Sequence, residues 1–154
     1  MSFQQPTPGH LFLNDIKTKI QQGDLVIPDF QREFVWSVQQ SASLLDSWIK
    51  GYPLGSFILW VSKEKLNIIK KIGVLEIAEQ QNPENPLTYV LDGQQRITSI
   101  YAAINGKKID DKRDFSKIII NLDADGFEDE IITILTEKTD FTYITFKEMF
   151  DYNL

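Results

Sequence analysis

The sequence contains no cysteine, and His10 is its only histidine. Disulfide-rich folds and zinc sites built from cysteine and histidine are therefore excluded. No apolar run approaches the roughly 20 residues that a membrane-spanning helix needs. The first ten residues are polar and lack the pattern of a signal peptide. These absences predict a protein of the reducing cytoplasm that has no membrane partner.

Positive charge is also scarce, because the formal net charge is -6 and the sequence pI is about 4.8. A surface that coats nucleic acid broadly is excluded, so any contact with DNA has to be local. The 154 residues include 42% hydrophobic residues, which is enough for one core of useful size. We see no internal repeat and no low-complexity tract, and we expect a single globular domain.

The chain is organised around residues 87–105. Leu87, Tyr89 and Leu91 alternate with other residues, as in a half-buried strand, and apolar residues from 97 to 104 recur on one helical face. A strand is therefore expected to pass directly into a helix.

The junction between this strand and helix reads Asp92-Gly93-Gln94-Gln95-Arg96. Gly93 permits a sharp bend and lets a ligand approach the backbone. The start of a helix favours an anion, and the guanidinium of a first-turn arginine can bind two oxygens of a phosphate. Because Arg96 lies off the apolar face, we expect it to contribute charge rather than packing. The junction predicts a phosphate-binding site, and the alternative is a plain turn in which Asp92 only caps the helix.

The segment at residues 29–36 combines Gln31 and Arg32 with three aromatic residues, namely Phe30, Phe34 and Trp36. Two interpretations are open. The aromatic residues fill the core while Arg32 pairs with an acid, or Gln31 and Arg32 face a ligand on a loop that the aromatic residues hold rigid.

The flanking elements follow from local patterns. Helices are expected before Gly23 and over residues 38–49, where Ser37 and Gln40 form a capping box. The continuous apolar run at 57–61 predicts the middle of a sheet, covered on both faces. Residues 74–77 are expected to pair with the strand before Asp92.

The last third of the chain is expected to add strands at residues 118–122 and 131–135. A second capping box, Thr145 with Glu148, then opens a helix near the end of the chain.

Three ordered blocks carry a resemblance: residues 27–32 with Trp36, residues 44–56, and residues 92–96. Together they resemble the N-terminal domain of GmrSD-type, modification-dependent restriction proteins, a branch of the ParB/sulfiredoxin-like superfamily that is marked by a DGQQR motif. The resemblance implies an α+β fold in which helices pack on a small mixed sheet. It implies a polar tail at 1–10, a ParB-like nucleotide-binding domain at 11–144, and the start of a truncated helical region at 145–154.

The resemblance also implies a function, the binding and hydrolysis of nucleoside triphosphates in defence against modified phage DNA. Asp92 would be the catalytic residue, holding Mg²⁺ or orienting the attacking water. Eight residues would bind the nucleotide and its phosphates: Gln31, Arg32, Gly55, Ser56, Gly93, Gln94, Gln95 and Arg96.

The chain departs from many such proteins because it lacks their helical remainder and nuclease domain. Nuclease activity is therefore not expected of this chain, and DNA would be a partner of a longer protein. Two alternatives stay open. One is a non-catalytic sensor of modified DNA that uses the aromatic residues at 30–36 for stacking, and the other is direct phosphodiester cleavage by residues 92–96.

Overall fold

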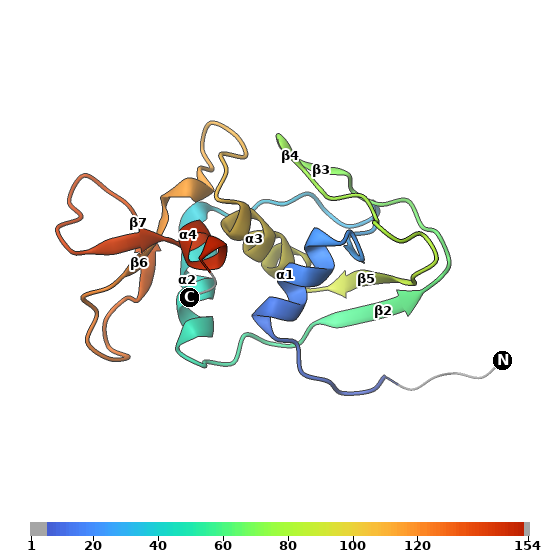
Figure 1. Cartoon of the computed structure of the whole chain (residues 1–154), viewed down its shortest axis with the longest axis horizontal. Helices are drawn as coiled ribbons and strands as arrows, with labels where there is room; N and C mark the ends of the chain where they lie inside the picture. The colour runs from blue at the N-terminus through green and yellow to red at the C-terminus, as the bar shows by residue number, and fades with distance from the viewer. Residues whose placement is uncertain (1–5, 153–154) are drawn as a thin grey trace.

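The computed structural model describes residues 6–152 and has a mixed α+β architecture (Figure 1). The first five residues of the predicted polar tail and the last two residues of the chain lie outside the described range. The elements in chain order are α1 (Leu13–Gln21), β1 (Leu25–Val26), α2 (Val38–Ile49), β2 (Ile58–Ser62), β3 (Lys71–Ile72), β4 (Leu75–Glu76), β5 (Leu87–Asp92), α3 (Gln94–Asn105), a short 3₁₀ helix (Phe115–Lys117), β6 (Ile118–Asn121), β7 (Ile132–Ile134), β8 (Tyr143–Thr145) and α4 (Phe146–Asp151). Among the described helices, none combines the length and apolar character needed to cross a membrane.

The sheet that leads to the predicted site has the order β1-β5-β2, with β5 parallel to β1 and antiparallel to β2. The prediction that residues 57–61 form its middle is wrong, because β2 is an edge strand. Ile58 and Val61 on β2 are 56% and 61% exposed. A continuous apolar run reports hydrophobicity but not the number of neighbouring strands, and here the strand covered on both faces is β5, which is buried from Leu87 to Val90.

The predicted pairing of residues 74–77 with β5 is also wrong. Strands β3 and β4 form their own antiparallel hairpin, in which Lys71 lies opposite Glu76. Since both edges of β5 are already occupied by β1 and β2, the hairpin has no strand of that sheet to join.

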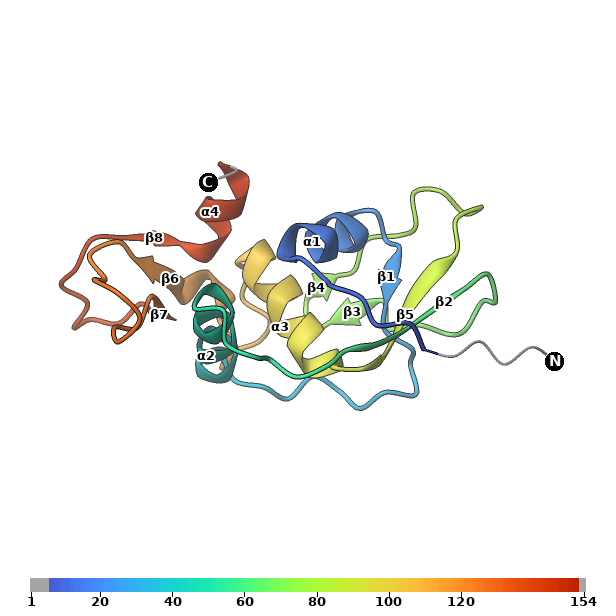
Figure 2. The same cartoon turned by 90° about the horizontal axis from the view of Figure 1, so that it is seen from below.

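Helix α3 is the central helix of the molecule, and it packs against α1, α2 and α4 (Figure 2). It begins directly after β5 and ends at Gly106, as the sequence predicts. Its burial is wider than one apolar face, because small residues such as Ala102 and Ala103 are fully buried as well. The buried hydroxyl groups of Ser99 on α3 and Ser41 on α2 share a hydrogen bond of 2.8 Å. This all-round burial fixes the position of the start of α3.

A second, antiparallel sheet has the order β7-β6-β8 and lies at the end of the molecule away from β2 and β5 (Figures 1 and 2). The predicted strands near residues 118–122 and 131–135 are confirmed, and β8 was not predicted. Asp46 of α2 links the two parts of the fold, because its carboxylate accepts hydrogen bonds from the amides of Ile131 and Ile132 at 2.7 and 2.9 Å.

Both predicted capping boxes are confirmed, at the start of α2 and at the start of α4. The helices that the sequence placed at residues 38–49 and near the end of the chain therefore begin where local side-chain chemistry starts them.

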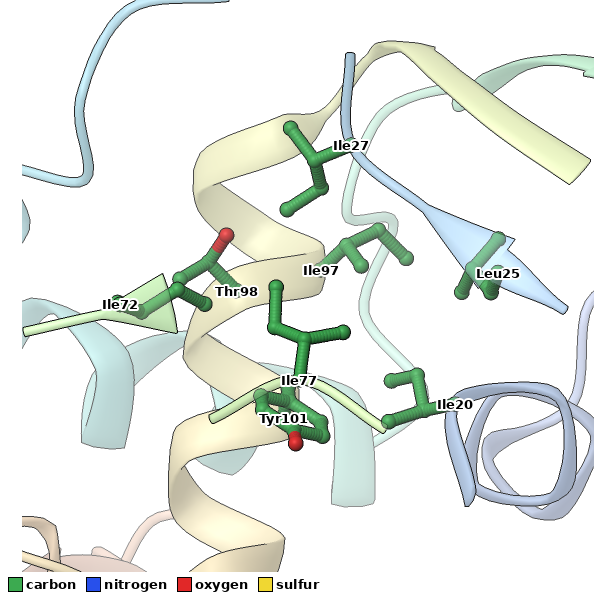
Figure 3. A pocket seen from close by; sticks show the side chains of 8 residues that line it. All are labelled: Ile20, Leu25, Ile27, Ile72, Ile77, Ile97, Thr98 and Tyr101. Carbon is green, nitrogen blue, oxygen red and sulfur yellow. The ribbon is translucent and has the colours of Figure 1, made fainter. Parts of the chain in front are cut away.

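A small cavity of about 10 Å³ lies beside α3 (Figure 3). Its lining includes isoleucines from several elements together with Thr98 and Tyr101 of α3. The Thr98 hydroxyl is buried and has no hydrogen-bond partner among the described residues. Burial raises the pKa of Tyr101, whose hydroxyl donates to the carbonyl of Glu76 at 2.7 Å. Ligand pockets measure roughly 300–1,000 Å³, so this cavity belongs to core packing.

Candidate functional site

The junction between β5 and α3 is a tight turn centred on Gly93. Gly93 is the residue before the first turn of α3 and has φ of 89°, a left-handed conformation that favours glycine. A Cβ atom at this position would lie 2.5 Å from the ring of Phe57, so a side chain has no room either. Gly93 is therefore required by both its backbone angle and its packing.

Asp92 is the last residue of β5, and its side chain is 62% exposed. The alternative in which Asp92 caps α3 is wrong, because Gly93 occupies the cap position and no side chain caps the helix. The nearest cation is Arg96, whose Nη2 lies 3.7 Å from Asp92 Oδ2. The carboxylate is thus free to face solvent or a ligand.

Arg96 holds a turn that we call the glycine turn, residues 51–57, between α2 and β2. Its guanidinium donates hydrogen bonds to the carbonyls of Leu54 and Ser56 at 2.5 and 2.7 Å and lies over the ring of Phe57, 4.6 Å from its centre. The side chain is 16% exposed. The expectation that Arg96 contributes charge rather than packing is therefore wrong, because it does both.

Gly55 makes this arrangement possible. It has φ of +80°, and a Cβ atom there would lie 2.8 Å from Arg96 Nη1. Gly55 and Ser56 are thus brought next to the junction, as the sequence predicts, and it is their backbone that meets Arg96.

Gln94 and Gln95 hold a second irregular segment, residues 29–36, which we call the arginine loop. Both glutamines are buried, at 5% and 7% exposure. The Gln94 amide donates to the carbonyl of Arg32 at 2.7 Å. The Gln95 amide accepts from the N–H of Val35 at 2.9 Å and donates to the carbonyl of Glu33 at 3.0 Å. The side chains of Gln94 and Gln95 therefore bond backbone N–H and C=O groups of the loop. These groups need such partners because the loop has no regular backbone hydrogen bonds.

Arg113 completes the support of the arginine loop, and no sequence pattern predicts this role. Its guanidinium donates to the carbonyl of Phe34 at 2.6 Å and lies over the ring of the same residue at 5.2 Å. Asp110 orients Arg113 through a hydrogen bond of 2.7 Å to Nε, and this bond holds the pKa of Asp110 below its usual value. Nothing in the lysine- and aspartate-rich stretch around Arg113 distinguishes it, because the contact spans almost eighty positions of sequence.

The supported loop leaves its own arginine exposed. The Arg32 side chain is exposed, and its guanidinium makes no hydrogen bond or ion pair with residues 6–152. Its neighbour Gln31 donates to the carbonyl of Leu91, the residue before Asp92, at 3.1 Å. The loop is thereby fixed against the end of β5, and Arg32 is carried next to the junction.

The three aromatic residues of the loop differ in their burial. Phe34 is 8% exposed and packs on Phe115, and Trp36 is partly buried. Phe30 is 67% exposed. A stacking surface made of all three rings is therefore wrong.

The structure brings the nine predicted site residues together around the start of α3. Within residues 6–152, no group of three or more histidine, cysteine, aspartate or glutamate side chains is arranged to hold a metal ion. The exposed charged residues of the junction and the arginine loop are Asp92, Arg32, Asp29 and Glu33.

Comparison with known proteins supports the resemblance that the sequence carries. Residues 12–153 match the family model described as GmrSD restriction endonuclease, N-terminal domain. An uncharacterized protein, MJ0686, of Methanocaldococcus jannaschii is 36% identical over 99 residues, which are 60% of this chain and 16% of the relative. The chain thus matches only a small part of that longer protein. The match over residues 12–153 shows that the chain belongs to the family of GmrSD restriction endonuclease N-terminal domains.

Proposed function

We propose that this chain is the nucleoside-triphosphate-binding and -hydrolysing module of a DNA restriction protein that acts in phage defence. One observation carries the proposal: the exposed Asp92 carboxylate ends β5 at the start of α3, and the exposed Arg32 side chain extends from a backbone position that Gln94 bonds there. Such preorganised charge is what phosphate binding and phosphoryl chemistry require.

The phosphates would bind at the first turn of α3. The amides of Gln94, Gln95 and Arg96 have no acceptor among the described residues, and they lie at the positive end of a twelve-residue helix. Gln94 and Gln95 therefore take part through their main-chain N–H groups, since their side chains are engaged with the arginine loop.

The two arginines have different parts in this proposal. Arg32 has an unengaged guanidinium that can bind two phosphate oxygens. Arg96 already donates to the glycine turn, so it contributes positive charge and the position of Gly55 and Ser56.

Asp92 fits Mg²⁺ in one specific way. Magnesium in nucleotide sites is held by one or two carboxylates together with phosphate oxygens and water, rather than by a cage of protein ligands. A single exposed carboxylate at the end of β5 suits that arrangement, and Mg²⁺ would neutralise charge on the phosphates. Without the ion, the bare Asp92 carboxylate would repel the phosphates. The alternative role for Asp92 is to orient the attacking water.

Asp92→Asn tests the catalytic role. Because Gly93 is the helix cap, the substitution leaves the start of α3 unchanged, and we expect nucleotide binding to persist while hydrolysis falls by at least about tenfold. Binding is measured by calorimetry with Mg²⁺ and each nucleoside triphosphate, and turnover by phosphate release. Asp111→Asn, at an exposed acid paired with Lys108, is the matched control. Hydrolysis by Asp92→Asn at the rate of the unchanged chain would contradict the role.

Arg32→Ala tests the binding site itself. We expect triphosphate affinity to fall by about tenfold or more, the loss typical of a charged hydrogen bond, with the melting temperature unchanged because the side chain is exposed. Arg32→Lys should restore little, since an ammonium group cannot bind two oxygens in parallel. Unchanged affinity in Arg32→Ala would remove the arginine loop from the site.

The sensor of modified DNA is tested in the same titrations. DNA binding through several phosphates weakens steeply as salt rises, whereas one triphosphate site depends on Mg²⁺. Strong, salt-sensitive binding of DNA without binding of nucleotide would favour the sensor over the hydrolase.

A further inference from the structure

A cleft of about 820 Å³ lies on the other side of the glycine turn. One wall is formed by residues 6–11, which precede α1, and the other by Trp48, the glycine turn and Leu59 of β2. Figure 2 shows the segment before α1 running close to the connection between α2 and β2. The volume lies within the range of sites that bind small molecules.

The lining of the cleft is rich in rings for its size. Trp48, Tyr52, Phe57 and His10 all contribute, and Tyr52 is 53% exposed. Planar aromatic side chains at a solvent-accessible surface offer stacking partners for a flat heterocycle, and they do so without demanding a particular base.

The cleft and the phosphate-binding site of the proposed function share the glycine turn and Phe57. Gly55 and Ser56 line the cleft, and their turn is held from behind by Arg96. Phe57 also lines the cleft, and its ring contacts both the guanidinium of Arg96 and the position of Gly93. One aromatic residue thus forms a wall shared by the two sites.

Resting on the proposed function, we infer that this cleft binds the base and sugar of the nucleotide whose phosphates lie at the start of α3. The base stacks on Tyr52 and beside Trp48. The backbone of the glycine turn lies between the base and the phosphates, which explains why the turn has to be fixed by Arg96.

Calorimetry with two probes tests the inference. The probes are a nucleoside triphosphate and inorganic tripolyphosphate, which has the phosphates but no base. We expect Tyr52→Ala to weaken binding of the nucleoside triphosphate by at least about fivefold, as loss of one stacked ring does, and to leave tripolyphosphate binding unchanged. Tyr143→Ala, at an exposed tyrosine of β8, is the matched control and should alter neither affinity.

Fluorescence supplies a second measurement. The chain has three tryptophans, and a variant with Trp36→Phe and Trp60→Phe keeps only Trp48. Its emission should change on addition of the nucleotide and stay constant with tripolyphosphate.

The outcomes separate this inference from the proposed function. If Tyr52→Ala binds the nucleotide as the unchanged chain does, the inference is overturned while the phosphate site stands. If the unchanged chain binds neither probe, both are overturned. Weakening of both probes to the same degree by Tyr52→Ala also overturns the inference, because the ring would then act on the phosphate site and not on the base.

Discussion

The arginine loop and the glycine turn are both irregular, and both are fixed by the same five-residue motif, but they are fixed in opposite ways. The arginine loop is held by neutral amides, since Gln94 and Gln95 bond three of its backbone groups. The glycine turn is held by a cation, because Arg96 bonds two of its carbonyls. Arg32 of the loop stays exposed, whereas Arg96 uses two of its N–H groups to bond carbonyls of the turn.

This difference separates positioning from binding within one motif. An amide can donate and accept at once, so a single buried glutamine can satisfy an N–H and a carbonyl of a neighbouring segment without burying charge. A guanidinium can only donate, and it suits a turn whose carbonyls converge. The side chains of Gln94, Gln95 and Arg96 therefore bond mainly to the protein backbone. Asp92 and the neighbouring Arg32 remain exposed.

Gln95→Ala should have the largest effect on stability. It leaves the N–H of Val35 and the carbonyl of Glu33 without their partner, and each such group costs roughly 1–3 kcal/mol in the free energy of unfolding. Gln31→Ala removes a single, solvent-exposed hydrogen bond to the carbonyl of Leu91. It should lower the free energy of unfolding by only about 0.5–1.5 kcal/mol. Equal losses for the two variants in urea unfolding would break the distinction between buried support and surface contact.

Gly55→Ala compared with Gly51→Ala isolates the contact with Arg96. Both glycines have positive φ, so each alanine carries a backbone penalty of roughly 1–2 kcal/mol. A Cβ at Gly51 meets nothing within 4 Å, whereas one at Gly55 lies 2.8 Å from Arg96 Nη1.

Gly55→Ala should therefore lose about 1 kcal/mol more than Gly51→Ala, through a weakened hydrogen bond. The measurement is thermal unfolding of both variants. If the two melting temperatures coincide, the turn is not held by Arg96 in solution.

Thr98→Val tests the opposite case, a buried polar group of α3 that supports no neighbouring segment. The Thr98 hydroxyl is fully buried without a partner among the described residues, so its removal should raise the free energy of unfolding by about 1 kcal/mol. Ser99→Ala is the control. It removes the hydroxyl that accepts from Ser41 and should lower stability instead. A destabilised Thr98→Val variant in denaturant titrations would show that the hydroxyl is paired.

Asp110→Asn should have the smallest effect, a slight loss of stability at neutral pH that disappears in acid. The bond from Arg113 lowers the pKa of Asp110 in the folded chain below its ordinary value of 3.8. This stabilisation is present above the unfolded pKa and is lost as pH falls through the folded pKa.

The melting temperature of Asp110→Asn should accordingly fall less steeply than that of the unchanged chain when pH drops below about 4. Asp111→Asn, at the neighbouring exposed acid, is the control. Identical acid profiles for Asp110→Asn and the unchanged chain would remove Asp110 from the support of the arginine loop.

Local chemistry was sufficient to predict many boundaries from the sequence. The capping residues Ser37 and Thr145 start their helices where predicted, and Gly106 ends α3. The passage of a strand into a helix at residues 92–94 is likewise confirmed. These features depend on interactions between residues a few positions apart, which a sequence displays directly.

Sheet order was decided by tertiary structure. The apolar run at 57–61 was predicted to form the middle of the sheet, but β5 occupies that place because β1 and β2 pair with its two sides. For the same reason, strand β4 within residues 74–77 pairs with β3 and not with β5. Hydrophobicity measures how much a strand prefers burial, and pairing depends on which strands meet it from distant parts of the chain.

The composition of the site was determined by the sequence, and the division of labour within it by the fold. The sequence brought Gln31, Arg32 and the DGQQR motif into one hypothesis through the ordered blocks that resemble the GmrSD-type family. Only the structure could show that the side chains of Gln94, Gln95 and Arg96 face inward onto backbone, and that Arg113 joins them from almost eighty residues beyond the loop. The physical reason is that a polar side chain satisfies whichever unpaired group lies nearest in space, and that group is set by the packing of the whole chain around α3.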